Sequence, residues 1–387
     1  MPAPLHLTAK GGRRLKSGYL WIYRDELTGA KPEFNGSIVA VNDASGEFFG
    51  HGFYSHNSKI AVRIITKTSR IPDRGFFQQA IKAAGLRRKG KIEKENAVRL
   101  VNAESDFLPG LIADWYAGHI VVQCLIPGVD MLREMFAEIL WEEFHPQGLW
   151  FRNDSGAREL EDLPLEKFFW RGQEIPEVVI TEGGVKFLIN LVEGHKTGSY
   201  LDQAENRMHA GELASGRCLD AFCFQGGFAL HLARKADEVL AVDSSQPALS
   251  VLEKNLEINR IKNVVPVKAN IFDFLPGLAK RGEAFNVVVL DPPPFAKSRK
   301  DLAAARKGYF ELNRRAISLL KPGGILMTYS CSFHFGLNEL LETISRASAD
   351  LGRQARLLEI QTQAADHPVL MSMPETWYLK GLVLELD

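Results

Sequence analysis

The sequence predicts a multidomain protein with a small N-terminal β-module, a central α+β domain and a C-terminal α/β Rossmann-like domain. Its 387 residues exceed the roughly 100–200 residues of a single domain. Short apolar runs separated by turn residues fill the start of the chain, and strand and helix patterns alternate through its second half. We therefore divide the chain into residues 1–71, 72–190 and 191–387.

The N-terminal segment is expected to be an all-β module. Its short apolar runs, separated by small polar turn residues, predict strands over 37–43, 47–55 and 60–66. After Pro72, apolar residues at helical spacing predict a helix with a basic end around residues 76–86.

The central segment mixes both kinds of pattern. Residues 111–126 predict a hairpin that turns at Ala117-Gly118. The next stretch, 128–144, predicts an amphipathic helix, and the apolar residues expected on one face are Met131, Met135, Ile139 and Leu140. Further strands are predicted over 149–153, 177–183 and 185–191, the last two joined at Gly183-Gly184.

The C-terminal segment predicts a doubly wound parallel sheet, in which ligands bind at the carboxyl ends of the strands. Strand patterns occupy 217–222, 238–245, 263–270, 284–294, 325–332, 355–361 and 377–386. Helix patterns occupy 226–236, 248–259, 309–321 and 337–352.

Composition indicates a folded protein of a reducing compartment, and we expect a cytoplasmic location. Hydrophobic residues make up 45% of the chain and charged residues 24%. No stretch reaches the roughly 18 apolar residues of a membrane helix, and the N-terminus lacks the apolar core of a signal peptide. The 4 scattered cysteines predict no disulfide scaffold, and the 10 histidines form no metal-binding pattern, so we expect no metal.

The net charge of zero results from cancellation between segments. Residues 1–91 hold 16 Lys and Arg against 6 Asp and Glu, whereas residues 92–190 hold 8 against 18. The rest of the chain is balanced, with 23 of each. A basic N-terminal segment favours binding to a polyanion. Cations and a ring that suit contacts with phosphates and bases lie near its start: Arg13, Arg14, Lys16 and Trp21.

Three successive strand ends carry groups that match the parts of S-adenosylmethionine. After the first strand, the turn over 220–227 ends in a glycine pair that lets the backbone approach a ligand closely. Asp243 ends the second strand and can accept both hydroxyls of a ribose. The third strand is expected to end in Phe272-Asp273, an apolar contact and a carboxylate for an adenine. A nucleotide or NAD is the alternative ligand, although the G-x-G-x-x-G spacing is absent.

The fourth and fifth strand ends offer catalytic groups. Asp291-Pro-Pro-Pro-Phe295 predicts a rigid loop that holds a carboxylate and a ring against a planar base, which is typical of methyltransferases acting on such bases. Cys331 ends the fifth strand on the same side of the sheet. Its thiolate can add to C6 of a pyrimidine, and this addition makes C5 a nucleophile. The other cysteines are expected to be structural: Cys124, Cys218 and Cys223.

These motifs resemble the class I methyltransferases of large-subunit ribosomal RNA, in particular the large-subunit methyltransferase I type, which forms 5-methylcytosine in 23S ribosomal RNA. The resemblance covers nearly the whole chain and includes residues 11–22, 103–111, 181–185, 196–203, 220–227, 291–295 and 330–332. The chain departs from the family pattern at Gln225, where a small hydroxylated residue is commoner, and at Phe333, where we expect glycine.

The resemblance implies a PUA-like N-terminal β-barrel, S-adenosyl-L-methionine as cofactor and large-subunit ribosomal RNA as substrate. It implies that Cys331 is the nucleophile and that Asp291 holds the cytosine. The implied cofactor-binding residues are Lys196, Tyr200, Asp202, Gln203, Arg207, Asp220, Phe222, Gly226, Gly227, Asp243, Ser244, Phe272 and Asp273. Substrate contacts are expected from Pro292 and Phe295 and from the four N-terminal residues named above. Family members form homodimers, and the sequence leaves the oligomeric state open.

Two other functional classes stay open. The chain could be an RNA-binding protein with a vestigial methyltransferase fold, although its strand-end carboxylates are intact. It could also be a methyltransferase that acts on another base or on a small molecule, in which case the basic N-terminal segment would have no purpose. The sequence identifies neither the modified nucleotide, nor free RNA or an assembled particle as substrate, nor the base that removes the C5 proton.

Overall fold

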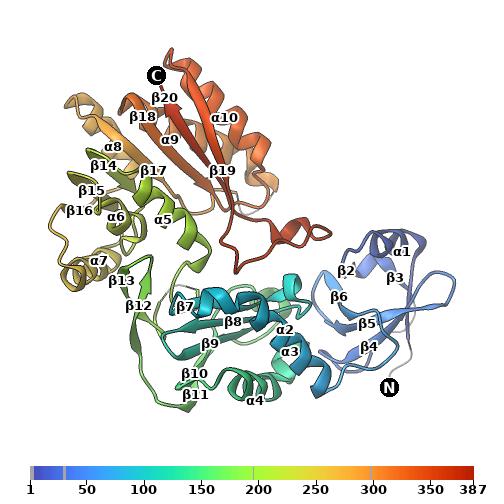
Figure 1. Cartoon of the computed structure of the whole chain (residues 1–387). Coiled ribbons are helices and arrows are strands. Elements are labelled where there is room, and N and C mark those ends of the chain that lie inside the picture. Colours follow the sequence, from blue (N-terminus) through green and yellow to red (C-terminus); the bar gives the residue numbers. More distant parts are fainter. Residues whose placement is uncertain (1–3, 29–31, 195, 297–298) are drawn as a thin grey trace. The chain divides into compact units, whose positions relative to one another are not determined.

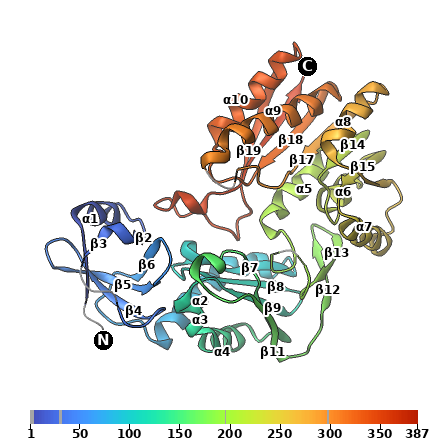
Figure 2. The ribbon, with the colours of Figure 1, turned by 180° about the vertical axis from the view of Figure 1, so that it is seen from behind.

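The computed structural model describes residues 4–28, 32–194, 196–296 and 299–387. The chain divides into two compact units, which Figures 1 and 2 show from opposite sides. The first unit comprises Met1–Thr181, Ile189–Leu201 and Ala365–Thr376, and the second comprises Glu182–Leu188, Asp202–Ala364 and Trp377–Asp387. The division of the sequence at residues 71 and 190 stays a prediction.

The first unit begins with a six-stranded sheet of order β2-β6-β5-β4-β1-β3. Its strands are β1 (Leu5–Leu7), β2 (Trp21–Tyr23), β3 (Leu27–Thr28), β4 (Ile38–Asn42), β5 (Phe48–Tyr54) and β6 (Ile60–Thr66). The three predicted strands are confirmed as β4, β5 and β6. Alternate residues of β4, Val39 and Val41, are fully buried, because one face of a half-buried strand packs on the core.

The N-terminal module is not purely β, which corrects our expectation. Residues Ala9–Lys16 form helix α1, and the side chain of Thr8 caps it by accepting a hydrogen bond from the Gly11 backbone N–H at 3.3 Å. Two glycines with low helix propensity concealed this helix in the sequence. Gly11 is buried, and a Cβ there would lie 3.0 Å from Cβ of Glu26, so a side chain at this point would fit only if its neighbour moved slightly away.

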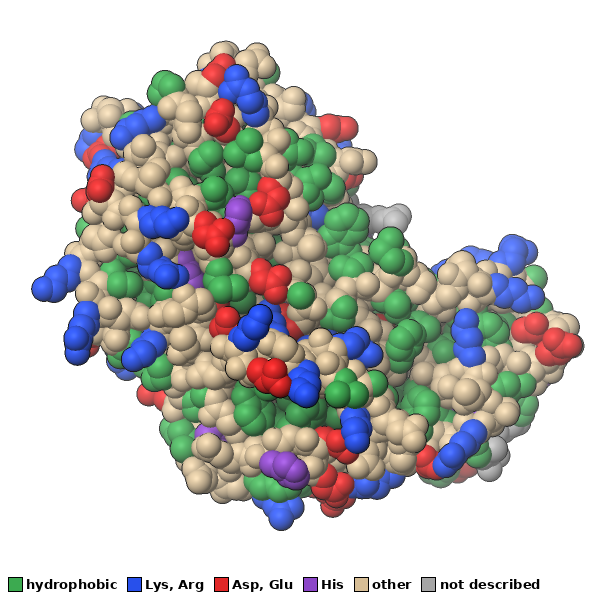
Figure 3. All heavy atoms as spheres, viewed as in Figure 1, with side chains coloured by type: hydrophobic (Ala, Val, Ile, Leu, Met, Phe, Trp, Pro, Cys, Tyr) green, Lys and Arg blue, Asp and Glu red, His purple; other side chains and the backbone are tan. Residues whose placement is uncertain are grey.

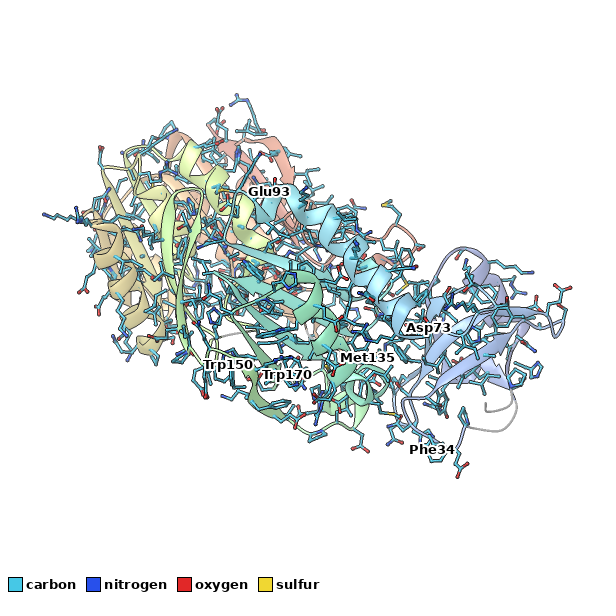
Figure 4. All side chains as sticks on the ribbon, turned by 60° about the horizontal axis from the view of Figure 1, so that its bottom comes forward. Phe34, Asp73, Glu93, Met135, Trp150 and Trp170 are labelled. Carbon is cyan, nitrogen blue, oxygen red and sulfur yellow. The ribbon has the colours of Figure 1, made fainter. Side chains whose placement is uncertain are left out.

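The central part of the first unit is a five-stranded sheet of order β11-β10-β9-β8-β7. Its strands are β7 (Ala97–Asn102), β8 (Leu111–Tyr116), β9 (His119–Cys124), β10 (Gly148–Asn153) and β11 (Glu166–Gly172). Its helices are α2 (Arg74–Ile92), α3 (Pro127–Met131) and α4 (Arg133–Phe144). Figure 4 shows α2 between Asp73, which caps it, and Glu93, and it labels Trp150 on β10 and Trp170 on β11.

Two expectations for this sheet differ in outcome. The hairpin is confirmed, since β8 and β9 pair antiparallel around Ala117-Gly118. The single helix over 128–144 is wrong, because the chain breaks between α3 and α4 at Leu132. The break shifts the helical phase, so Met131 is 63% exposed. The prediction is confirmed for Ile139 and Leu140, which lie on the buried face of α4 together with Phe136 and Ala137.

Strands β12 (Glu177–Glu182) and β13 (Val185–Asn190) form the predicted hairpin. Its turn residues, Gly183 and Gly184, have positive φ angles of 54° and 84°, a conformation that glycine adopts without strain.

The second unit contains a seven-stranded sheet of order β16-β15-β14-β17-β18-β20-β19. Its strands are β14 (Arg217–Ala221), β15 (Glu238–Asp243), β16 (Val264–Lys268), β17 (Phe285–Leu290), β18 (Leu320–Ser330), β19 (Ala355–Gln361) and β20 (Lys380–Leu386). Its helices are α5 (Ala204–Leu213), α6 (Gly227–Leu232), α7 (Gln246–Asn259), α8 (Ile271–Lys280), α9 (Leu302–Ser318) and α10 (Leu337–Asp350). Helices α5 to α7 cover one face of the sheet and α8 to α10 the other (Figures 1 and 2).

This sheet confirms the doubly wound prediction with two corrections. Strand β20 lies antiparallel between β18 and β19, so the sheet is not wholly parallel. The third strand, β16, ends at Lys268 rather than at Asp273. Asn270 stops the strand because its side chain accepts a hydrogen bond from the Phe272 backbone N–H at 2.9 Å and begins helix α8. Among the described residues, no helix has the length and apolar character that crossing a membrane requires.

Candidate active site

The carboxyl ends of four adjacent strands gather the predicted site residues of the second unit. Strands β15, β14, β17 and β18 are neighbours and pair in parallel, so their carboxyl ends lie at one edge of the sheet. Asp220 lies near the end of β14, Asp243 ends β15, Asp291 follows β17, and Cys331 follows β18. Their nearness has an electrostatic effect, because Asp291 and Asp243 both help to raise the pKa of Asp220.

The turn between β14 and α6 has an unusual backbone. Phe222 and Phe224 have positive φ angles of 72° and 49°, and Gly226 follows at 88°. Such angles cost a residue with a side chain about 1–3 kcal/mol, and they persist only where the surroundings enforce them. Here the backbone N–H groups of Phe222 and Cys223 donate to the Val242 carbonyl at 2.9 and 3.0 Å. The neighbouring strand β15 therefore holds the turn in place.

Asp243 continues this support with its side chain. One carboxylate oxygen accepts a hydrogen bond from the Phe224 N–H at 2.9 Å, and the other accepts one from the Ser245 N–H at 2.8 Å. The carboxylate is thus fixed in orientation while remaining partly exposed. A carboxylate oxygen has a second lone pair, so Asp243 can still accept the hydroxyls of a ribose.

Asp220 is a buried acid with one unused oxygen. Its Oδ2 accepts a hydrogen bond from the Ala229 N–H at 2.8 Å, whereas its Oδ1 has no partner among the described residues. Burial, together with the nearby charges of Asp291 and Asp243, raises the pKa of Asp220 to about 8. A cationic group bound beside Oδ1 would stabilise the ionised carboxylate, as the ammonium of an amino-acid tail would.

These residues fit S-adenosylmethionine. The unused Oδ1 of Asp220 suits its ammonium group, and Asp243 suits its ribose. Gly226 and Gly227 keep the backbone of the turn bare: a Cβ on Gly226 would lie 2.3 Å from Leu252, and one on Gly227 would lie 2.8 Å from Arg207. The partly buried ring of Phe272 offers an apolar contact for an adenine, while Ser244 and Asp273 are exposed.

Arg207 on α5 lies against this turn and belongs to a buried ionic cluster. Its Nε and Nη2 donate to Glu182 at 2.8 and 2.5 Å, and His231 lies 3.0 Å from the same carboxylate. Burial alone would raise the pKa of Glu182, but Arg207 and His231 together lower it to about 2. Arg207 is thus an anchor behind Gly227, and Glu182 and His231 are additional to the predicted residues.

Aromatic rings line the side of the site near Asp291. Phe295 lies 6.0 Å from Phe272 and 4.6 Å from Tyr309 between ring centroids, and Tyr309 stacks on Phe335 at 4.4 Å. The structure thus brings Phe295 and Phe272 together. Pro292 beside Asp291 is buried, which restrains the loop.

Cys331 is the only cysteine that is partly exposed, since Cys124, Cys218 and Cys223 are buried and all four cysteines lie in described residues. Burial raises the pKa of each of those three thiols, that of Cys218 to about 11. Next to Cys331, the Ser332 hydroxyl accepts a hydrogen bond from the Ala296 N–H at 3.3 Å. This bond ties the Cys331 turn to the loop that begins at Asp291.

The polar segment before α5 falls in both units. In the first unit the Lys196 ammonium lies 4.4 Å from the centroid of the Tyr200 ring, and Lys196 is exposed. In the second unit Asp202 accepts a hydrogen bond from the Tyr378 hydroxyl at 2.8 Å, and Gln203 accepts one from Asn206 at 2.7 Å. Asp202 and Gln203 are buried.

The four N-terminal residues proposed for RNA contact differ in accessibility. Arg13 and Lys16 on α1 are exposed. Arg14 instead lies 4.7 and 4.4 Å from the rings of Tyr19 and Tyr23 and pairs with buried Glu26. The indole of Trp21 donates to Glu104 at 2.9 Å. Arg14 and Trp21 therefore have partners within the first unit and are partly exposed, whereas Arg13 and Lys16 are exposed; RNA contact by all four residues stays a prediction.

Comparison with known proteins decides the family. Residues 5–67 match the model of the PUA-like domain, and residues 202–324 match that of Conserved hypothetical protein 95. Ribosomal RNA large subunit methyltransferase I of Aeromonas hydrophila is 36% identical over 394 residues, which cover 99% of both chains. The protein of the same name from Shewanella amazonensis is 37% identical over 98% of both chains. The chain belongs to the ribosomal RNA large subunit methyltransferase I family.

Solved structures agree with this assignment at the level of the fold. A SAM-dependent methyltransferase from Streptococcus mutans superposes with a TM-score of 0.85 at 18% identity, covering 99% of this chain and 100% of that one. A methyltransferase structure in complex with SAH gives 0.87 at 19% identity and the same coverage. The predicted PUA-like module and class I methyltransferase fold are therefore confirmed for this member of the methyltransferase I family.

One residue of this family member was absent from our predictions although it contacts the Cys331 turn. Lys380 begins β20, is 4% exposed, and donates from Nζ to the Ser332 carbonyl at 2.8 Å. A sequence signal exists, because Lys380 is the single cation in the otherwise apolar and uncharged stretch 376–384. Its partner could not be read from the sequence, since 48 residues separate it from Ser332.

Proposed function

We propose that this protein is an S-adenosylmethionine-dependent methyltransferase that acts on carbon C5 of a cytosine in large-subunit ribosomal RNA. The observation that carries the proposal is the gathering of Asp220, Asp243, Asp291 and Cys331 at one edge of the sheet. The names of the relatives support ribosomal RNA as the substrate, and the SAH complex of the structural neighbour supports the cofactor.

The chain supplies both the binding groups and the nucleophile. S-adenosylmethionine supplies the methyl group when bound. Asp220, the turn over 222–227 and Asp243 hold the cofactor, with Arg207 supporting the turn from behind. The Asp291 carboxylate accepts a hydrogen bond from the exocyclic amine of the cytosine, and Phe295 limits the position of the ring.

Cys331 performs the covalent step. Its thiolate sulfur forms a bond to C6 of the cytosine, and the electron pair of the C5–C6 double bond moves toward C5. C5 then takes the methyl group, and the bond between the methyl carbon and the sulfonium sulfur breaks with its electron pair left on that sulfur. Later loss of the C5 proton to a base returns an electron pair that re-forms the C5–C6 double bond and expels the cysteine sulfur. The target cytosine must be unstacked to reach the thiol, so a cytosine that stays paired within a duplex cannot react.

We also propose a division of labour along the chain. Residues 1–71 contact RNA through a PUA-like module, residues 72–190 form the central domain, and residues 191–387 carry the chemistry. In the N-terminal module the exposed cations Arg13 and Lys16 are the proposed phosphate contacts.

The test is methyl transfer from labelled S-adenosylmethionine to unmodified large-subunit ribosomal RNA, followed by digestion to nucleosides. We expect label in 5-methylcytidine and a loss of roughly a thousandfold or more in Cys331→Ala, because the nucleophile is removed. The matched control is Cys218→Ala, a buried cysteine on β14, which should keep its activity.

Two results would contradict the proposal in different ways. If the label appears in another nucleoside, the protein is still an RNA methyltransferase, but the thiolate mechanism at cytosine C5 is wrong. Full activity of Cys331→Ala would remove the cysteine from the reaction even if 5-methylcytidine is formed. The same experiment is repeated with assembled large subunits. If only the assembled subunits become labelled, the substrate is the particle and not free RNA.

A further inference from the structure

Lys380 is a buried cation for which the mechanism above has no use. It is 4% exposed and belongs to β20, which is covered on both edges by β18 and β19. Burying an ammonium group is costly unless a counter-charge or good acceptors face it. The surroundings of Lys380 should therefore contain the group that stabilises it.

The sheet register places Lys380 beside Cys331. In the antiparallel pair of β18 and β20, Lys380 stands directly opposite Ser330, the residue before the cysteine. Its side chain then reaches the residue after the cysteine, since Nζ donates to the Ser332 carbonyl at 2.8 Å. Lys380 thus spans the turn on which Cys331 lies, with its backbone on one side and its amine on the other.

The electrostatics of this arrangement couple the two groups. Burial lowers the pKa of Lys380 to about 8, and negative charge on Cys331, and next on Glu339 of α10, opposes this lowering. The interaction is mutual, so a Lys380 ammonium favours the thiolate of Cys331 as much as the thiolate favours the ammonium. Further titratable groups near the turn are Asp291 after β17, Tyr309 of α9 and the partly exposed His334, three residues after Cys331. The pKa of Tyr309 is raised by burial and then by Cys331 and Asp291.

We propose that Lys380 is a positioning residue that holds Cys331 as a thiolate ready to attack the pyrimidine. The Lys380 ammonium stabilises the thiolate: when the S–H bond breaks, its electron pair stays on sulfur, the proton passes to solvent water, and the negative sulfur is paired with the ammonium. The ammonium keeps its own protons, and the Ser332 carbonyl accepts a hydrogen bond from Nζ that fixes its direction. This inference rests on the proposed nucleophilic role of Cys331.

The test is the rate at which iodoacetamide alkylates Cys331 in the full-length protein, measured by mass spectrometry from pH 6 to pH 10 without RNA or cofactor. Cys331 can be followed selectively because the other three cysteines are buried. In the wild type we expect the inflection of the pH profile below the ordinary thiol value of about 8.5. In Lys380→Met it should move up by about one unit, which slows alkylation at pH 7 roughly tenfold.

Two further variants separate charge from structure. Lys380→Arg keeps a cation and should recover most of the rate at pH 7. Lys321→Met removes a lysine from the opposite end of β18 and should leave the profile unchanged. At pH 10 the wild type and Lys380→Met should react at similar rates, because the thiol is then ionised in both.

Specific outcomes would overturn the inference. One is an inflection at or above about 8.5 in the wild-type protein, which needs no variant and so is informative even if Lys380→Met fails to fold. Another is an equal inflection in the wild type and Lys380→Met. The two experiments fail independently. If the labelling experiment yields no 5-methylcytidine, the proposed function is wrong, whereas the alkylation profile, measured without RNA or cofactor, still shows whether Lys380 lowers the pKa of Cys331.

Discussion

Asp220 is a buried carboxyl group whose ionisation should affect the stability of the protein. Its oxygens are fully buried, and only Oδ2 is satisfied within the described residues. The fold therefore favours the protonated acid, and burial raises its pKa to about 8. An unfolded aspartic acid titrates near 3.9, so the folded state binds the extra proton between these two values.

The free energy of unfolding should consequently fall as pH rises from about 4 to about 8 and then level off, by a few kcal/mol in total. Asp220→Asn keeps an acceptor for the Ala229 N–H but cannot ionise, so its stability relative to the wild type should increase over this range. Urea unfolding at pH 5, 7 and 9 measures the difference. Asp273→Asn, at an exposed carboxylate, is the control, and parallel pH curves for Asp220→Asn and the wild type would refute the prediction.

At the same scale, two arginines that we predicted as ligand contacts also have structural partners, and their contact with a ligand stays a prediction. Arg207 donates two hydrogen bonds to Glu182, and Arg14 pairs with Glu26 between two tyrosine rings. An arginine near a glycine-rich turn or in a basic run looks the same in sequence whether it faces a ligand or a buried acid. The acid that pairs with each arginine lies 12 residues away along the chain for Arg14 and 25 residues away for Arg207, so a local motif does not reveal it.

At the scale of elements, the turn into α6 combines two demands on one glycine. Gly226 has a φ of 88°, and a Cβ there would lie 2.3 Å from Leu252 and 2.4 Å from Leu230. Gly282 has a similar φ of 69° but open space around it. Alanine variants at Gly226 and Gly282 therefore distinguish the cost of a positive φ angle from the cost of steric overlap.

Gly282→Ala should lose about 1–2 kcal/mol of unfolding free energy, the cost of a left-handed conformation with a side chain. Gly226→Ala should lose this amount and a further 1–3 kcal/mol or so, because the core must shift to admit the methyl group. Chemical denaturation gives both values, and S-adenosylmethionine affinity by calorimetry should fall only in Gly226→Ala. Equal losses in the two variants would show that Leu252 and Leu230 yield without cost.

Elements were predictable where their pattern is local. The strands β4, β5 and β6 and the alternation from β14 onward follow from periodicity and turn residues. Helix α1 was not predicted because its two glycines, which have low helix propensity, serve close packing. The break at Leu132 was not predicted because a shift of helical phase leaves the apolar composition unchanged. Helix α8 escaped because Asn270 acts as a cap within a stretch that reads as a strand end.

At the scale of the whole molecule, charge is segregated along a neutral chain. The first 91 residues carry an excess of cations and the next 99 an equal excess of acids. Lys and Arg side chains are visible on the N-terminal module in the face that Figure 3 shows. RNA affinity should depend on these cations and weaken with salt, because each neutralised phosphate releases counterions.

We predict that Arg13→Ala combined with Lys16→Ala weakens binding to a large-subunit ribosomal RNA fragment and lowers the salt slope. Each lost phosphate contact should reduce the slope of log K against log salt by about 0.7–0.9. Fluorescence anisotropy between 50 and 200 mM salt measures both quantities. The control is Lys94→Ala, which removes an exposed lysine from the acidic central segment and should leave the salt slope unaltered. If Lys94→Ala changes the slope by as much as the double variant, the effect comes from overall charge and not from contacts made by α1.

The sequence alone determined the succession of a β-module, an α+β domain and a Rossmann-like domain, and it indicated which strand ends carry Asp220, Asp243, Asp291 and Cys331. These features are local, because periodicity and strand-end residues act over a few positions. Only the tertiary structure decided what surrounds those residues. The antiparallel insertion of β20 brings Lys380 to the Cys331 turn, and the same folding brings Glu182 to Arg207 and His231. Such pairings depend on sheet order and burial, which long-range packing fixes and no local pattern encodes.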